Sequence, residues 1–416
     1  MKSATLTTPH RHAYSPITMR QSTTECALEF KASGQNGRGM DFSTHSTLSF
    51  KMQAKKNRLS LAQSSLVRAS IFLLLNSLSN VVFFVIIFTF ATFRKETIFM
   101  KTLIVVSGGD APGINTLIAR YLRLATTNGD EVIGADGGFE GLLAGKIVTI
   151  DQSIVTLLAG RGGTVLASSR VPVLGEDRAQ QKLREIIEQN EIDKILLFGG
   201  DGTLRHVLPL LNDWGIPCIG LPTTIDNDVA GTDYTLGHHS ACNFALQSID
   251  GVLATAHALP GRIFMVETLG GNTGYLALAI AYAAGAQTVL VPEYELSLEW
   301  LGQRLKETTT RDGYALVVLS EGVSIIPQLE EAIPRLTGIR LRYTRLGHAQ
   351  RGGDVSHFDR VVAHEMSRLA YTGFKDNVQI GTIIMQSGQL SLFEGKLSGE
   401  IKAPPDLDQY KFINEL

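Results

Sequence analysis

Cysteine is scarce in this chain of 416 residues. The three cysteines, Cys26, Cys218 and Cys242, are an odd number and lack the spacing of metal ligands. Disulfide frameworks and structural zinc sites need cysteines in even sets or at short regular spacings, so both classes are disfavoured. We therefore expect buried thiols in a reducing compartment, the cytoplasm.

An excess of positive charge is also missing. The chain has 38 Lys and Arg against 40 Asp and Glu, and its pI is near 6.6. Nucleic-acid-binding proteins usually carry a basic surplus, so a nucleic-acid partner is not expected. The charge is uneven, because residues 1–99 hold 12 basic and 4 acidic side chains, which leaves 26 and 36 for the rest. A basic segment precedes an acidic body.

The first 99 residues read differently from the body. Residues 1–70 are rich in Ser and Thr and are predicted to be disordered. Residues 71–93 are uncharged and long enough to span a bilayer, although four Asn and Ser residues weaken them as a membrane helix. A membrane anchor, an organellar targeting peptide and a region translated from a wrongly chosen start remain open. We favour the wrongly chosen start, because the body starts at Met100 without a linker. For the body itself no membrane contact is expected.

The body repeats the order strand, glycine turn, helix. Residues 101–106 predict a buried strand, residues 107–113 a turn, and residues 115–124 a helix. Glycines at such a turn let backbone N–H groups approach a phosphate at the helix N-terminus, although tight packing alone would also use them. The turn lacks the G-x-G-x-x-G spacing of dinucleotide sites, which disfavours a nicotinamide cofactor.

A second unit contains an acidic residue in its glycine turn. A strand is predicted over 194–198 and a helix over 204–211, with Gly-Gly-Asp-Gly-Thr between them at 199–203. A carboxylate in a phosphate-binding turn is unfavourable unless a cation is present, so Asp201 is a candidate Mg²⁺ ligand. The pattern also occurs in kinases of NAD and of lipids. It therefore indicates a nucleotide phosphate more surely than it indicates the acceptor.

Two carboxylates follow a third apolar run. Residues 216–221 predict a buried parallel strand, and Asp226 and Asp228 come just after it. In an extended segment residues i and i+2 face the same way, so both carboxylates would point into one cleft. One could accept a proton while the other holds a cation or a backbone donor. The alternative is that Asp-Asn-Asp only forms a turn or a helix cap.

Six motifs in order resemble those of the bacterial-type 6-phosphofructokinases, over essentially all of residues 100–416. The motifs are Ser-Gly-Gly-Asp-Ala-Pro-Gly at 107–113, Gly-Gly-Thr at 162–164 with Arg170, Gly-Gly-Asp-Gly-Thr at 199–203, Pro-Thr-Thr-Ile-Asp-Asn-Asp at 222–228, Gly-Thr-Asp-Tyr at 231–234, and Gly-His-Ala-Gln-Arg-Gly-Gly at 347–353. The resemblance implies an α/β fold of two doubly wound, Rossmann-like three-layer domains with the active site in the cleft between them. A nucleotide-binding domain would comprise residues 100–237 and 351–400, and a sugar-phosphate domain residues 238–350 and 401–416.

The resemblance also implies an activity, the phosphorylation of D-fructose 6-phosphate to fructose 1,6-bisphosphate in glycolysis, with ATP as donor and Mg²⁺ as cofactor. Asp226 matches the family's catalytic base, with Thr224 and Asp228 beside it. Gly108 and Arg170 match groups that stabilise the transferring phosphoryl group. Asp201 matches the family's Mg²⁺ ligand. The residues implied to bind the donor are Gly108, Arg170, Gly199, Gly200, Asp201, Gly202 and Thr203. The residues implied to bind the sugar phosphate are Thr224, Asp226, Arg262, Leu269, Gly270, Glu321, Arg342, His348 and Arg351.

In the family two of the sugar-phosphate arginines come from a neighbouring subunit. For this chain those are Arg262 and Arg342, so a homo-oligomer, usually a tetramer with shared active sites, is implied. Two departures leave alternatives open. Gly271 stands where most catalytic members have an arginine beside the reacting phosphoryl group, which leaves room for a catalytically weak paralogue that binds sugar phosphate. Thr223 stands where ATP-using members usually have glycine and pyrophosphate-using ones lysine, so a pyrophosphate-dependent enzyme is the nearer alternative.

Overall fold

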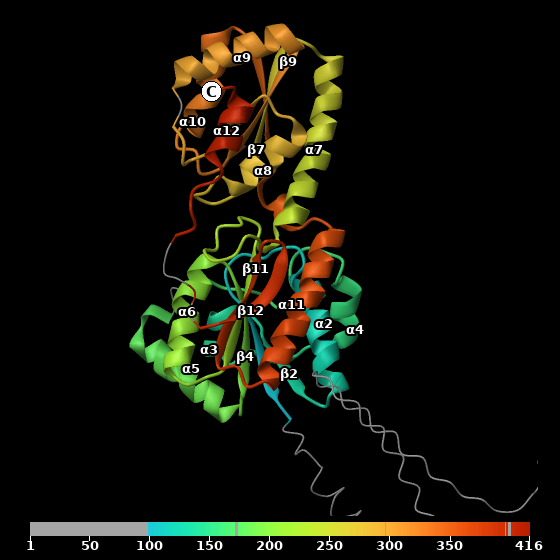
Figure 1. Ribbon diagram of the computed structural model, residues 1–416, viewed down its shortest axis with the longest axis vertical. Coiled ribbons are helices and arrows are strands. Elements are labelled where there is room, and N and C mark those ends of the chain that lie inside the picture. The colour runs from blue at the N-terminus through green and yellow to red at the C-terminus, as the bar shows by residue number, and fades with distance from the viewer. Residues whose placement is uncertain (1–98, 171–173, 296, 396, 398–400) are drawn as a thin grey trace, which may run out of the picture. The chain divides into compact units, whose positions relative to one another are not determined.

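The computed structural model of the protein describes residues 99–170, 174–295, 297–395, 397 and 401–416 (Figure 1). The disordered segment expected over residues 1–70 and the apolar segment over 71–93 lie outside these residues. Within the described ranges, no helix combines the length and the apolar character needed to cross a bilayer.

The larger of two sheets, called the large sheet here, has the order β12-β11-β5-β4-β1-β2-β3, with β6 paired to β5. Its strands are β1 (Lys101–Val106), β2 (Glu131–Ala135), β3 (Ile147–Thr149), β4 (Lys194–Gly199), β5 (Cys218–Thr224), β6 (Leu236–Gly237), β11 (Ile380–Gln386) and β12 (Gln389–Glu394). Only the outer strands β3 and β12 pair in an antiparallel manner among those described. The inner strands β4 and β5 are buried at every residue, as expected for parallel strands covered on both faces.

Helices cover both faces of the large sheet (Figure 1). One face carries α2 (Ile114–Thr127), α4 (Gln152–Leu158) and α11 (His357–Lys375), and the other carries α3 (Gly138–Leu143), α5 (Asp177–Gln189) and α6 (Asp201–Asp213). The apolar periodicity of these helices explains the packing. In α5 only Leu183 and Ile187 are buried, four residues apart on one side, while the charged residues remain at the surface.

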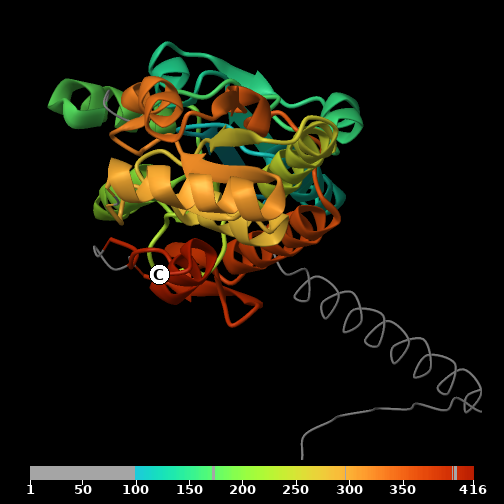
Figure 2. The same ribbon diagram turned by 90° about the horizontal axis from the view of Figure 1, so that it is seen from above.

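The second sheet, called the small sheet here, is parallel throughout and has the order β10-β7-β9-β8. Its strands are β7 (Arg262–Thr268), β8 (Thr288–Leu290), β9 (Tyr314–Ser320) and β10 (Arg340–Arg345). Its helices are α7 (His238–Ala258), α8 (Tyr275–Ala284), α9 (Leu298–Asp312), α10 (Ile326–Thr337) and α12 (Leu407–Asn414). Helices α9 and α10 share one apolar cluster with the sheet, whereas α8 packs on the opposite face and α12 packs on α8. The chain ends at α12, marked C in Figures 1 and 2. A mostly parallel large sheet and a parallel small sheet, each covered by helices on both faces, confirm the predicted fold class.

Three turns meet because of the strand order. Strands β5, β4 and β1 are neighbours, so the segments after them lie side by side at the carboxyl edge of the large sheet. From β1 the chain continues to β2 and β3 on one side and later to β4 and β5 on the other side, which makes the gap between β1 and β4 a topological switch point. Ligands of doubly wound sheets bind at such points.

The predicted element boundaries are right for β1 and shifted elsewhere. Strand β1 covers residues 101–106 as expected. The helix predicted over 204–211 begins at Asp201, where an acidic residue in the first turn complements the helix dipole. The strand predicted over 216–221 runs instead from Cys218 to Thr224. Ile216 closes the preceding helix by donating its N–H to Leu211 O at 3.0 Å, so it is not available to the sheet.

Candidate active site

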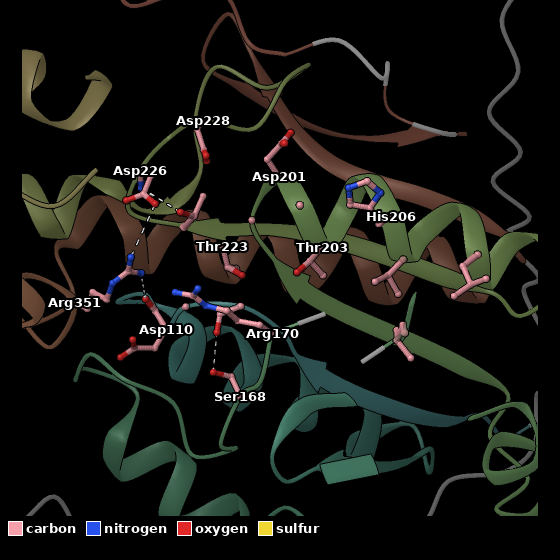
Figure 3. Close-up of a pocket in the computed structure, with 18 of the residues that line it drawn as sticks. Asp110, Ser168, Arg170, Asp201, Thr203, His206, Thr223, Asp226, Asp228 and Arg351 are labelled. Carbon is pink, nitrogen blue, oxygen red and sulfur yellow. Dashed lines mark hydrogen bonds and ion pairs between the residues drawn. The ribbon is translucent and has the colours of Figure 1, made fainter. Parts of the chain in front are cut away.

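A pocket of about 900 Å³ lies at the three turns of the large sheet (Figure 3). The turn after β1 contributes Gly108, the start of α6 contributes residues 200–203, and the segment at the end of β5 contributes Thr224, Asp226 and Asp228. Arg170, His348 and Arg351 complete this part of the wall. The structure therefore brings most of the predicted donor and catalytic residues into one cavity.

The first turn is shaped by Arg351. Its Nη1 donates to the backbone oxygen of Asp110 at 3.0 Å, and its Nη2 lies 4.0 Å from Asp226 Oδ2. Figure 3 shows the guanidinium between these two residues. A Cβ at Gly109 would lie 2.5 Å from Nη1, so a larger residue there would displace the guanidinium of Arg351. The Ser168 hydroxyl donates to Gly108 O at 2.9 Å and supports the same turn.

The N-terminus of α6 forms the second wall of the pocket. Gly200 caps the helix without a side-chain hydrogen bond to the first turn. The first backbone N–H groups of a helix lack intrahelical partners and carry the positive end of its dipole, which favours a phosphate. Gly199 packs against Thr203, since an added Cβ would lie 2.5 Å from Thr203 Cβ. Asp201 Oδ1 accepts from Arg205 Nη2 at 2.7 Å.

The third wall corrects the predicted geometry of the two carboxylates. Asn227, between Asp226 and Asp228, has a φ of 56° and is in the left-handed region, so the segment turns and is not extended. Asparagine tolerates this conformation, and its Nδ2 donates to Asp233 O at 3.2 Å. Both carboxylates nevertheless line the pocket. The expected meeting of the two groups is right, but the reason is a turn rather than strand alternation.

Burial sets the proton affinity of these carboxyl groups. Burial is the largest cause that raises the pKa of Asp226, the charges of Asp228 and Glu321 also raise it, and the net pKa is about 6. The guanidinium of Arg351 acts in the opposite direction and lowers the pKa of Asp226. Burial also raises the pKa of Asp228. Asp226 Oδ1 is buried and has no hydrogen-bond partner among the described residues, so it is available to a proton donor.

Two residues at the carboxyl ends of strands in the small sheet lie beside the pocket: Gly271 follows β7, and Glu321 follows β9. Gly271 lies next to the base candidate, because a Cβ added to it would be 3.7 Å from Asp226 Oδ2. Its N–H donates to Glu321 Oε1 at 2.9 Å. The neighbouring Gly270 has a φ of 145°, and an added Cβ would lie 2.9 Å from Thr273 O.

Gln350 lies within the motif at 347–353, but the motif analysis assigned it no role. It is fully buried, and its Oε1 accepts the backbone N–H of Leu269 at 2.9 Å. It thereby ties the 3-10 turn that carries His348 and Arg351 (Gly347–Arg351) to the segment after β7. Only the tertiary contact between these distant segments reveals the role.

Comparison with known proteins decides the family. The family model described as phosphofructokinase matches residues 101–373. The chain belongs to the phosphofructokinase family. It is 33% identical over 321 residues to the ATP-dependent 6-phosphofructokinase of Aquifex aeolicus, covering 76% of this chain and 99% of that protein. It is 38% identical over 271 residues to the ATP-dependent 6-phosphofructokinase of Vibrio cholerae, covering 65% and 84% of the two chains.

The fold of the phosphofructokinases is also found by structural comparison. A solved pyrophosphate-dependent phosphofructokinase from Marinobacter aquaeolei superposes with a TM-score of 0.66 at 21% identity, covering 76% of this chain and 91% of that one. At this identity the likeness shows the shared fold alone. Both donor classes thus use the architecture seen here.

In this phosphofructokinase the pocket extends beyond the motif residues. Its further lining includes Leu174 and Gln180, and the α6 residues His206, Val207 and Leu210. Leu210 comes four positions after His206, so both lie on one face of α6. No sequence motif marks this part of the pocket, because isolated apolar residues on a helix are typical of ordinary packing.

Arg262 and Arg342 are not brought to this pocket within the chain. They line a separate groove of about 550 Å³ between α7 and the outer strand of the small sheet. Arg262 lies opposite Arg340 in the register of β7 and β10. Burial, followed by repulsion from Arg340 and Arg262, lowers the pKa of Arg342. No carboxylate forms an ion pair with these three arginines within the described ranges.

Proposed function

We propose that this phosphofructokinase transfers the γ-phosphoryl group of ATP to the 1-hydroxyl of fructose 6-phosphate. The observation that carries the proposal is Asp226, a buried carboxyl group with an unpartnered oxygen and a raised pKa. It lies between the N-terminus of α6, suited to the donor phosphates, and the segment of Gly271 and Glu321, suited to the sugar. General bases work best when their pKa approaches the working pH.

The other residues have roles set by their position. Asp226 accepts the proton of the attacking hydroxyl, and the charge of Arg351 favours the ionised form of its carboxyl group. Gly108 and Arg170 face the transferring phosphoryl group from the opposite wall. Phosphoryl transfer needs little beyond such positioning and the neutralisation of charge. Glu321 and His348 bind the sugar phosphate.

The donor set fits Mg²⁺. No group of three or more metal-ligating side chains occurs in the described part of the chain. Mg²⁺ keeps several waters and is usually held by one or two carboxylates together with substrate phosphates, so a large cluster is not required. Asp201, with Asp228 across the pocket, would hold the ion beside the donor phosphates. When bound, Mg²⁺ neutralises charge on the transferring group.

ATP is the proposed donor. A Cβ at Gly202 would meet nothing within 4 Å, so the wall of the pocket is open beside the donor phosphates. The apolar surface of Leu174, Val207 and Leu210 suits a nucleotide base, which pyrophosphate lacks. Thr223 is buried, and its hydroxyl has no partner among the described residues. It offers a hydrogen bond but no charge for pyrophosphate.

One coupled assay tests the function and its rivals. Fructose 6-phosphate is supplied with ATP or with pyrophosphate in parallel, at saturating Mg²⁺, and formation of fructose 1,6-bisphosphate is followed. We expect turnover with ATP and little with pyrophosphate. The reverse preference would establish the pyrophosphate-dependent alternative. Binding of the sugar phosphate without turnover by either donor would establish the weak paralogue suggested by Gly271.

The pH dependence should report Asp226. With a pKa of about 6, its carboxyl group is protonated below that pH and cannot accept a proton, so kcat should fall about tenfold per pH unit below 6. Arg351 lowers this pKa, and therefore Arg351→Gln should move the acid limb to higher pH. Titration of the substrate phosphates would give a limb that does not move between the two proteins. An unmoved limb in a folded, active variant would contradict the assignment.

We further propose a homo-oligomer, a tetramer as in the family, in which Arg262 and Arg342 serve a neighbour's site. Their clustering with Arg340 away from the chain's own pocket supports this arrangement. Arg262→Ala should raise KM for fructose 6-phosphate by about 10-fold to 10²-fold and change KM for ATP little, because a phosphate loses a charged partner. Arg335→Ala, at an exposed arginine outside that groove, is the matched control.

Subunit mixing tests whether the site is shared. Arg262→Ala and Asp226→Asn proteins are mixed under conditions where exchange of subunits is demonstrated. Hybrid oligomers should recover part of the wild-type activity, since some sites then combine an intact Asp226 with an intact Arg262. Lack of recovery would mean that each site is built within one chain.

The domain boundaries and the cellular compartment remain to be assigned. We infer that residues 100–237 and 351–400 form the nucleotide-binding domain and that residues 238–350 and 401–416 form the sugar-phosphate domain. The grouping of strands into the large and small sheets supports this division. The proposed reaction belongs to glycolysis, so we place the protein in the cytoplasm.

A further inference from the structure

We propose that Lys402, in the segment before α12, is a positioning residue that holds the turn carrying Asp226 and Asp228 in its active conformation. Lys402 Nζ donates to the backbone oxygen of Asn227 at 2.7 Å. Asn227 is the residue between the two carboxylates, although 175 positions separate it from Lys402. The proposal deepens the proposed function, on which it rests.

Lys402 contacts Asn227, the non-glycine residue of this turn whose backbone is in the left-handed conformation. Asn227 has a φ of 56°, in the left-handed region that most L-amino acids avoid and asparagine tolerates, so contacts that fix its peptide also fix the turn. Its side chain bonds to Asp233 O, and the Lys402 ammonium fixes its carbonyl group. Rotation of this peptide would redirect the side chains on both sides of it, Asp226 and Asp228. The lysine thus acts on the base through the backbone.

The groups around the Lys402 side chain favour a positive charge at its end. Its Nζ lies 4.9 Å from the centroid of the Tyr275 ring, at the start of α8. Burial lowers the pKa of Lys402, while the carboxylates of Asp228 and Asp233 raise it. Among the described residues, Asp228 and Asp233 are the charged groups that change the pKa of Lys402. The hydrogen bond to the carbonyl group and the contact with the ring hold this half-buried ammonium group in place, and the charges of the two carboxylates favour a cation there.

The segment of Lys402 is itself anchored to the small sheet. The Tyr294 hydroxyl donates to Pro405 O at 2.6 Å. At the end of α12, the Asn414 side chain pairs with both backbone groups of Val289, in β8, at 3.0 and 3.1 Å. The segment that contains Lys402 is therefore bound to the small sheet, and the Lys402 side chain contacts the turn that follows β5 of the large sheet. It sets the turn relative to the segment that carries Gly271 and Glu321.

Substitution should separate turnover from binding. In Lys402→Met the length of the side chain stays but its donor and charge are lost, and we expect kcat to fall about 10-fold to 10²-fold, the usual effect of a small misplacement of a catalytic group. KM for fructose 6-phosphate and ATP should change less than about threefold, since Lys402 does not line the pocket. Lys402→Arg keeps donor and charge and should recover most of the turnover. Lys411→Met, at an exposed lysine of α12, is the control.

Hydrogen exchange provides a readout that does not depend on activity. Amides of residues 225–229 should exchange at least about tenfold faster in Lys402→Met than in the wild type, with Lys402→Arg in between. If Lys402→Met does not remain folded, Lys402→Gln is measured by the same criteria. A wild type inactive with fructose 6-phosphate, but with exchange that responds as described, would overturn the proposed function and support the contact. Near-wild-type kcat and unchanged exchange in the folded variant would overturn the role of Lys402.

Discussion

Asp226→Asn is expected to lower kcat by about 10²-fold to 10⁴-fold, the usual contribution of a general base. The amide has the same shape as the carboxyl group but cannot accept a proton from the sugar hydroxyl. Asp226 Oδ1 makes no hydrogen bond within the described residues, so no internal contact is lost there. Equilibrium binding of fructose 6-phosphate should therefore remain nearly intact, measured by calorimetry beside the coupled assay.

The control for this substitution is an exposed aspartate. Asp376→Asn, at the end of α11 and outside the pocket, should leave kcat and binding unchanged. Turnover of Asp226→Asn near that of the wild type would remove Asp226 from the role of base. Asp228 would then be the next carboxylate to test, because it lines the same pocket.

Gly202→Asp should reduce kcat/KM for ATP by at least about 10²-fold, equivalent to about 2.7 kcal/mol. The added Cβ meets open space at the N-terminus of α6, so the new side chain fits but places a carboxylate beside the donor phosphates. It also adds a like charge near Asp201 and Asp228. Both effects act on the donor and leave the sugar site unchanged.

Gly202→Ala separates charge from bulk. Alanine has the same Cβ, occupies the same open space and favours the helix, so it should retain ATP use within a few-fold. If alanine and aspartate are equally harmful, the conflict is steric. If neither is harmful, or if the wild type turns over faster with pyrophosphate than with ATP, residue 202 does not set the donor. Thr223 would then be the residue to exchange.

The sequence supported the fold well because the strands are fully buried. Runs such as Leu-Ile-Val-Val in β1 are apolar at consecutive positions, a pattern typical of parallel strands under two helix layers. Turn glycines and acidic residues then marked the carboxyl edge of the sheet. Boundaries were less accurate, as at Asp201 and Ile216, because a cap or a closing hydrogen bond decides where an element ends.

The candidate site was predictable where its residues are close in sequence. Motifs located Asp226 and Asp228, but not the left-handed Asn227 that brings them together. Gln350 and Lys402 act on segments 81 and 175 positions away, and no local pattern identifies such partners. The groove of Arg262 and Arg342 likewise depends on the register of β7 and β10. Tertiary contacts, rather than composition, define these parts of the site.

Strand β11 is synthesised long after its neighbour β5, and this order has a consequence for folding during biosynthesis. Strand β5 needs β11 as its neighbour, and Cys218 and Ile380, paired in register, are separated by more than 150 residues. While the ribosome is still producing the intervening chain, β5 presents an open apolar edge to the cell. Nascent chains that have completed β4 and β5 but not β11 should therefore engage chaperones or aggregate. Native pairing at this edge, and with it protease resistance, should appear only after residue 386 has left the exit tunnel.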